Sequence, residues 1–269
     1  MPRPASPRIL TTIITNVATL ASAIYSLISL TNSNLLILPN SLLLNWTIPC
    51  NPSGQTLRGG WHVSNLQTGL TYEDSDTGFK SNLYERTNKK GKTEYVYATA
   101  GTDDIHDVKT DAFQSFYRTD AQYGRFTSNA RGLAEGLEGR KLSFTGHSLG
   151  GGLASANALA TGKSAITFNA AGVGQDTKDR LGLFSSARID AYVVEGEIVS
   201  VAQSIVKLQA DGNIHALRAS YGIQNSVGRA IIQNYTLLQD AEAYYEMYQR
   251  VINHTMGVVL QKLVEQGYE

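Results

Sequence analysis

The stretch that most constrains the fold is KLSFTGHSLGGGLA, residues 141–154. Residues 141–145 are typical of a buried strand, and the alanine-rich residues 149–161 are typical of a helix. Ser148 stands at their junction, between Gly146 and Gly150. A strand that turns abruptly into a helix strains the central residue, and glycine two positions before and after it avoids clashes. The stretch therefore predicts a sharp strand–turn–helix that presents the Ser148 hydroxyl.

The chain after Arg58 shows strand patterns that alternate with helix patterns. This alternation predicts an α/β fold, with a mostly parallel sheet that carries helices on both faces. The expected strands are residues 93–102, 141–145, 165–172 and 188–197, and the expected helices are residues 105–117, 120–137, 149–161 and 236–252.

Composition excludes several classes of function. Lys plus Arg and Asp plus Glu number 23 each, so the net charge is zero and no overall field attracts nucleic acid. Cys50 is the only cysteine, which excludes an internal disulfide and a cysteine-rich metal site.

Charge patterning divides the chain into two parts. No charged residue occurs between Arg8 and Arg58. We therefore expect an apolar N-terminal segment, residues 1–55, followed by one α/β domain, residues 56–269.

Three interpretations of the N-terminal segment stay open. Ile9 to Leu30 is long enough to cross a bilayer, and the small residues Ala21 and Ala23 suit signal peptidase. The segment is a secretory signal or membrane anchor, a buried or partner-packing amphipathic helix, or an interfacial lipid-binding element. We expect a secreted or membrane-associated protein, with a cytoplasmic protein awaiting specialised secretion as the alternative.

The predicted turn gives Ser148 the setting of a nucleophile. It places the hydroxyl and the N–H of Leu149 at the positive end of a helix, where an oxyanion is stabilised. A serine hydroxyl reacts only when a histidine takes its proton and a carboxylate orients that histidine. In this arrangement the acid follows the serine in the chain, and the histidine follows the acid.

Chain order leaves few candidates for the acid and the base. Glu197 lies at the carboxyl end of the expected strand 188–197, where ligand-facing residues collect, and we expect it to be the acid, ahead of Glu195 and Asp190. Asp176 and Asp211 are expected to be solvated turn residues. For the base, chain order leaves His254 and His215 open, because the other histidines, His62, His106 and His147, precede the acid. We expect His147 to point away from the turn.

Several longer motifs then indicate a family. FTGHSLGGGLASANALATGKSAITFNAAGVG (144–174), TKDRLG (177–182) and VYATAGTDDIHDVKTD (96–111) resemble the bacterial phospholipase A1 branch of the class 3 lipases. The resemblance covers about residues 60–200 well. It implies an α/β-hydrolase fold with Ser148 as nucleophile, Glu197 as acid and His254 as base, without cofactor or metal. It also implies a second oxyanion donor, the N–H of Thr102.

The chain departs from the family pattern in two places. The acid is Glu where Asp is commoner, and the helix that usually precedes the first strand is not recognisable.

The activity that the resemblance implies is release of fatty acid from phospholipids at a membrane or micelle interface, through an acyl-enzyme. A triacylglycerol lipase, a short-chain esterase and a catalytically silent membrane-anchored scaffold stay open as alternatives. By analogy with the family, a further possibility is a secreted toxin that has a cognate inhibitor protein.

Residues 103–117 contain an acidic cluster and an apolar stripe, and each of these two features has two interpretations. Asp103, Asp104, Asp107 and Asp111 suit a solvated helix start better than a calcium site. The stripe from Ile105 to Tyr117 suits a lid or a helix packed on the sheet.

Overall fold

A computed structural model describes residues 58–66, 68–74, 79–100, 120–205, 207–219, 249–250 and 252–268. Several of the expectations above therefore fall on residues outside the described ranges: the apolar segment 1–55, the oxyanion donor Thr102, the acidic cluster and apolar stripe of residues 103–117, the position of His106 and most of the helix 236–252.

An eight-stranded sheet forms the centre of the described part of the chain, in the order β1-β3-β4-β5-β6-β7-β8, with β2 paired to β3. The strands β4 to β8 are parallel, whereas β3 pairs antiparallel with β1, β2 and β4. The predicted mostly parallel sheet is confirmed. The bounds are β1 His62–Val63, β2 Glu73–Asp74, β3 Phe79–Thr87, β4 Thr93–Thr99, β5 Lys141–His147, β6 Ser164–Phe168, β7 Ile189–Val194 and β8 Asn213–Leu217.

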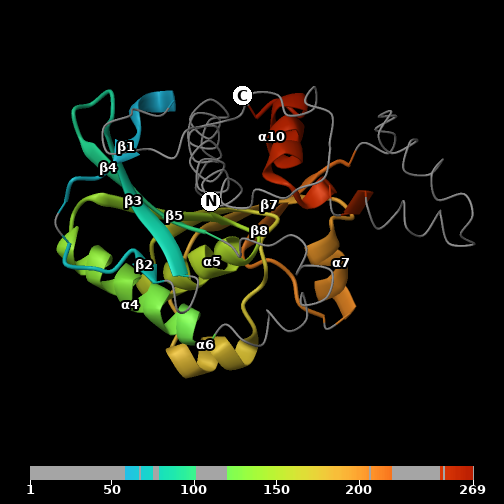
Figure 1. Cartoon of the computed structure of the whole chain (residues 1–269), viewed down its shortest axis with the longest axis horizontal. Helices are drawn as coiled ribbons and strands as arrows, with labels where there is room; N and C mark the ends of the chain where they lie inside the picture. The colour runs from blue at the N-terminus through green and yellow to red at the C-terminus, as the bar shows by residue number, and fades with distance from the viewer. Residues whose placement is uncertain are drawn as a thin grey trace, which may run out of the picture.

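Helices cover both faces of this sheet, as predicted. Figure 1 shows α4 and α6 below the sheet and α10 above it. A short 3-10 turn, η1, precedes β1. The bounds are η1 Arg58–Gly60, α4 Asp120–Gly136, α5 Leu149–Thr161, α6 Gln175–Leu181, α7 Ile198–Ile205 and α10 Met256–Glu265.

The strand predictions were wrong in two respects. Expected strands 93–102, 165–172 and 188–197 end earlier, at Thr99, Phe168 and Val194. The residues that follow Phe168 and Val194 leave the sheet at its carboxyl edge, where loops carry functional side chains. The antiparallel strand β3 was not predicted, although it pairs with β4 along its whole length.

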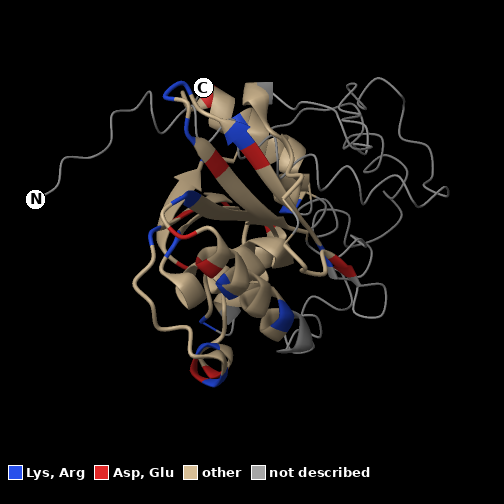
Figure 2. Ribbon diagram, turned by 90° about the vertical axis from the view of Figure 1, so that its left-hand side faces the viewer, with Lys and Arg blue, Asp and Glu red and all other residues tan. Residues whose placement is uncertain are grey.

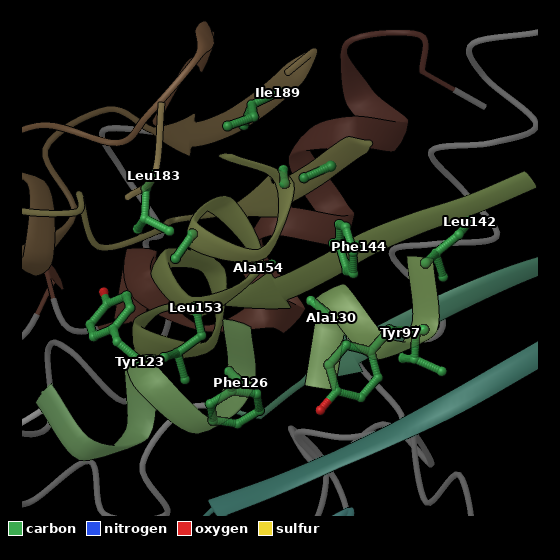
Figure 3. Packing of buried hydrophobic residues seen from close by; sticks show 14 of the residues in the cluster. Tyr97, Tyr123, Phe126, Ala130, Leu142, Phe144, Leu153, Ala154, Leu183 and Ile189 are labelled. Atoms are coloured by element: carbon green, nitrogen blue, oxygen red, sulfur yellow. The ribbon is translucent and has the colours of Figure 1, made fainter. Parts of the chain in front are cut away.

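One hydrophobic core lies between the sheet and the helices α4 and α5 (Figure 3). Side chains alternate between the two faces of a strand, so Tyr95 and Tyr97 of β4 enter this core. Val96 and Ala98 point to the other face, against Trp61. Figure 3 shows Phe126 and Leu153 meeting between the two helices.

A second core on the opposite face holds α10 against β6, β7 and β8. Its fully buried members include Phe168, Tyr192, Leu217 and Val259. Burying side chains of this size stabilises the packing by about 1.5–3 kcal/mol each. This core fixes the start of α10, and therefore the residues immediately before it, relative to the ends of the strands.

Charged residues of both signs are interspersed on the ribbon in Figure 2. This matches the zero net charge of the chain. In the part of the chain that the structure describes, no helix has the length and apolarity needed to cross a membrane.

Candidate active site

The turn between β5 and α5 has the strained geometry that the sequence predicts. Ser148 has φ 58° and ψ −128°, outside the regions that side chains with a Cβ favour. A Cβ added to Gly146 would lie 2.1 Å from the carbonyl oxygen of Gly150, so only glycine allows the helix to approach the strand. The Ser148 N–H donates to Phe168 O at 3.0 Å, and Ser148 O accepts from the Ala171 N–H at 3.0 Å. These bonds hold the turn against the end of β6.

His254, which is distant from Ser148 in the sequence, contacts the serine hydroxyl. Its Nε2 lies 2.8 Å from Ser148 Oγ, although the two residues are 106 positions apart. His254 is the last helical residue before Thr255, and Thr255 then caps α10. The predicted junction position of His254 is therefore present, and the buried ring is fixed in place.

Glu197 lies on the other side of the His254 ring. Its Oε2 is 2.5 Å from His254 Nδ1, and the carboxylate is fully buried. Two backbone N–H groups at the start of α7 also donate to this carboxylate, Val199 to Oε2 at 2.8 Å and Ser200 to Oε1 at 2.5 Å. A helix N-terminus stabilises negative charge, so the start of α7 helps to stabilise this buried carboxylate.

The hydrogen bonds determine which nitrogen of His254 carries the proton. An ionised carboxylate only accepts hydrogen bonds, so Nδ1 of the neutral ring is the donor to Glu197. Nε2 then has a free lone pair, which accepts from the Ser148 hydroxyl. The arrangement can remove a proton from the serine oxygen and retain it on a ring that a carboxylate stabilises.

His215, the alternative candidate for the base, and Asp190, a less favoured candidate for the acid, bind each other. His215 Nε2 lies 3.0 Å from Asp190 Oδ1, and the His215 ring stacks on Tyr192 with centroids 4.7 Å apart. Asp190 is the second residue of β7, whereas Glu197 follows the end of that strand. Of the two histidines that chain order left open, the structure brings His254 and not His215 to Ser148.

One prediction about the remaining carboxylates was wrong. Asp211 is mostly buried, accepts from the Val173 N–H at 2.8 Å and pairs with Lys178 Nζ at 2.5 Å. It therefore anchors the loop after β6 and is not a solvated turn residue. Asp176 and Glu195 are exposed.

His147 has a contact that sequence reasoning missed. Its Nε2 lies 2.6 Å from the carbonyl oxygen of His254, and the two rings are 4.8 Å apart. Burial, together with the neighbouring His254, lowers the pKa of His147 to about 3. Asn169, at the end of β6, contacts the same carbonyl and was also missed. Its place directly after a parallel strand was the available signal.

Of the two expected oxyanion donors, one lies in the described part of the chain. Leu149 is the first residue of α5, so its N–H has no carbonyl one turn earlier in the helix to bind. Thr102 lies outside the described residues. Within the described ranges, no three His, Cys, Asp or Glu side chains gather as a metal site would require.

The solved structures that resemble this chain have low sequence identity to it. The Penicillium expansum triacylglycerol lipase structure is 16% identical, with a TM-score of 0.49, over 80% of this chain and 82% of that one. The native Rhizomucor miehei lipase propeptide complex is 14% identical, with a TM-score of 0.46, over 80% of this chain and 70% of that one.

Comparisons of the sequence identify a relative with higher identity and a family. An extracellular phospholipase A1 of Serratia liquefaciens is 43% identical over 114 residues, which are 42% of this chain. The match covers 34% of that protein, about a third of its length. The family described as phospholipase-like, Tle-like phospholipase domain, matches residues 58–246. That match includes the strand–turn–helix with Ser148 and also Glu197, and it spans well over half of the chain. The chain therefore belongs to the Tle-like phospholipase domain family.

Proposed function

We propose that this protein is a serine carboxylester hydrolase that releases fatty acid from phospholipids, with the specificity of a phospholipase A1. The observation that carries the proposal is the continuous chain of hydrogen bonds from Ser148 Oγ through His254 to Glu197. Family membership and the name of the Serratia relative support phospholipid as the substrate class.

The first half of the proposed reaction forms an acyl-enzyme. His254 Nε2 takes the Ser148 proton while Oγ bonds to the ester carbonyl carbon, and the carbonyl oxygen becomes an oxyanion. The Leu149 N–H, with Thr102 as the proposed second donor, stabilises that charge. The carbon–oxygen bond to the glycerol then breaks, and His254 returns its proton to the leaving alcohol.

The second half releases the fatty acid. A water molecule gives a proton to His254 and attacks the acyl carbon, and the Ser148 ester bond breaks as Oγ recovers the proton. Glu197 stays ionised and stabilises the positive ring in both halves. Its full burial strengthens this interaction, because the surrounding dielectric is low.

The proposed setting is a membrane or micelle surface outside the cytoplasm. The apolar segment 1–55 would act as an export signal or an anchor, and the extracellular Serratia relative supports export. N-terminal sequencing of the exported protein decides between them, since cleavage near Ala23 indicates a signal and an intact terminus indicates an anchor. A cognate inhibitor protein would accompany a toxin and would co-purify with the enzyme when both are expressed.

A fluorophosphonate probe tests the proposed nucleophile. We expect covalent labelling of the purified protein and loss of the label in Ser148→Ala and in His254→Ala, with circular dichroism showing that both variants are folded. Both variants should also fail to hydrolyse phospholipid vesicles. An unlabelled wild-type protein that cleaves neither vesicles nor soluble esters would contradict the proposal and favour a catalytically silent scaffold.

A further inference from the structure

The backbone before α10 leaves a buried carbonyl that the helix itself does not use. In a continuous helix, His254 O would accept from the N–H of Val258, four residues later. That N–H instead approaches Thr255 Oγ1, because Thr255 caps a new helix. Buried backbone carbonyls require partners, so the protein must supply donors from elsewhere.

Two side chains supply those donors. His147 Nε2 lies 2.6 Å from His254 O, and Asn169 Nδ2 donates to the same oxygen at 3.0 Å. Asn169 Nδ2 also donates to Asn253 O at 3.0 Å. We call His147, Asn169 and these two carbonyls the carbonyl clamp.

The clamp connects the base to the positions of the nucleophile and the acid. His147 directly precedes Ser148 in the chain. Asn169 Oδ1 accepts from the Val194 N–H at 2.8 Å, and Val194 O accepts from the Glu197 N–H at 3.2 Å. The clamp therefore joins the backbone of His254 to the strand ends that carry the other two residues.

The two clamp side chains suit this task chemically. Asn169 is fully buried, and its amide has only one orientation that gives Oδ1 a donor and Nδ2 two acceptors. Its φ of 42° is in the left-handed region, which Asn and Asp tolerate better than other residues with a Cβ. A neutral His147 ring donates without placing a second positive charge beside His254.

We propose that Asn169 and His147 are positioning residues that fix the His254 backbone so that its ring meets both Ser148 and Glu197. The inference rests on the proposed function, in which His254 is the base. The hydrogen bonds of both side chains to the carbonyl oxygen of His254 give them a direct hold on its backbone, so we infer that they act through His254.

Asn169→Asp is the sharpest test, because it keeps the size, the acceptor and the tolerance of the left-handed conformation. It replaces the amide donor with an oxygen that faces two carbonyls. We expect kcat for an ester substrate to fall about 10- to 100-fold with KM unchanged, since small misplacement of a catalytic group has effects of this size.

Asn129→Asp is the matched control. Asn129 is also a buried amide whose Nδ2 donates to a backbone carbonyl, Thr71 O, at 2.9 Å, but it lies on α4. The Asn129→Asp variant should lose about as much stability as Asn169→Asp, and its kcat should equal that of the wild-type protein. An equal loss of kcat in both variants, or none in Asn169→Asp, would overturn the inference and leave the proposed function intact.

A second pair of variants covers the case in which Asn169→Asp does not fold. His147→Gln keeps an N–H donor near the position of Nε2, whereas His147→Leu removes it. We expect His147→Gln to retain most of the kcat and His147→Leu to lose it at least about 10-fold. Equal kcat values in the two would overturn the role of His147.

Nuclear magnetic resonance of ¹⁵N-labelled histidine tests the clamp independently of activity. The His254 ring signals should shift or broaden in Asn169→Asp and His147→Leu, and should be unchanged in Asn129→Asp. If the wild-type protein hydrolyses no ester, the proposed function fails, yet these spectra still decide the clamp. Unchanged His254 signals in both clamp variants would overturn it.

Discussion

Glu197→Gln is the substitution with the most informative consequence. The carboxylate accepts three hydrogen bonds, from His254 Nδ1 and from the N–H groups of Val199 and Ser200. Oε2 serves His254 and Val199, and Oε1 serves Ser200. A glutamine has one oxygen and one NH₂ group to place where two acceptors stood.

Each orientation of the new amide loses something specific. With its oxygen toward His254, the NH₂ group faces the Ser200 N–H, and a buried donor without a partner costs about 1–3 kcal/mol of stability. With NH₂ toward His254, Nδ1 must accept, and the proton moves to Nε2, the wrong tautomer. In either case the negative charge that stabilises the ring is lost. In Ser-His-Asp triads the amide replacement costs about 10⁴-fold in kcat, or about 5 kcal/mol.

The assay is steady-state hydrolysis of a chromogenic ester and of phospholipid vesicles, with urea unfolding as the measure of folding. We expect kcat to fall about 10³- to 10⁴-fold in Glu197→Gln, and less in Glu197→Asp, which keeps the charge with a shorter reach. A folded Glu197→Gln protein that retains more than about a tenth of wild-type kcat would refute the assignment of Glu197.

Three further predictions follow from the same geometry. His254→Ala should abolish ester hydrolysis while His215→Ala keeps most of it, as initial rates will show; the reverse result would contradict the choice of base. Gly146→Ala places a Cβ 2.1 Å from Gly150 O, so urea unfolding should show a loss of about 3 kcal/mol or more, and near wild-type stability would contradict the tight turn. His147 has a folded pKa of about 3 against an ordinary value of 6.5, so the unfolded chain binds the proton first as pH falls. Stability should therefore decline between pH 6.5 and pH 3 by up to about 1.4 kcal/mol per pH unit, and His147→Gln should remove that part of the slope, which pH-dependent urea unfolding measures.

The sequence predicted the strand–turn–helix around Ser148 because that geometry depends on residues close together in the chain. Glycine is required at position 146 because a Cβ there would clash with the backbone of Gly150, so the local pattern alone indicates the turn. Glu197 was predictable for a similar reason. It follows a buried strand at the carboxyl edge of a parallel sheet, where functional side chains collect.

The choice between His254 and His215 could not be made from residue patterns alone. Both follow the acid, and each has a carboxylate partner that only the tertiary structure reveals, Glu197 for one and Asp190 for the other. The resemblance to a family was needed to favour His254.

Asn169 and β3 were missed for physical reasons. An asparagine after a strand resembles an ordinary turn residue, and its partners Asn253 and His254 are more than 80 positions away. The β3 strand, Phe79–Thr87, contains Lys80, Glu85 and Arg86, which obscure the apolar alternation of a strand.

The measurement that tests the central claim most directly uses phospholipids labelled separately on the sn-1 and sn-2 acyl chains. The purified wild-type protein and its Ser148→Ala variant are incubated with vesicles of each lipid, and the released fatty acid is quantified. We predict release of the sn-1 label by the wild-type protein and none by Ser148→Ala. Release of only the sn-2 label would contradict the proposed specificity, and equal release by the variant would contradict Ser148 as the nucleophile.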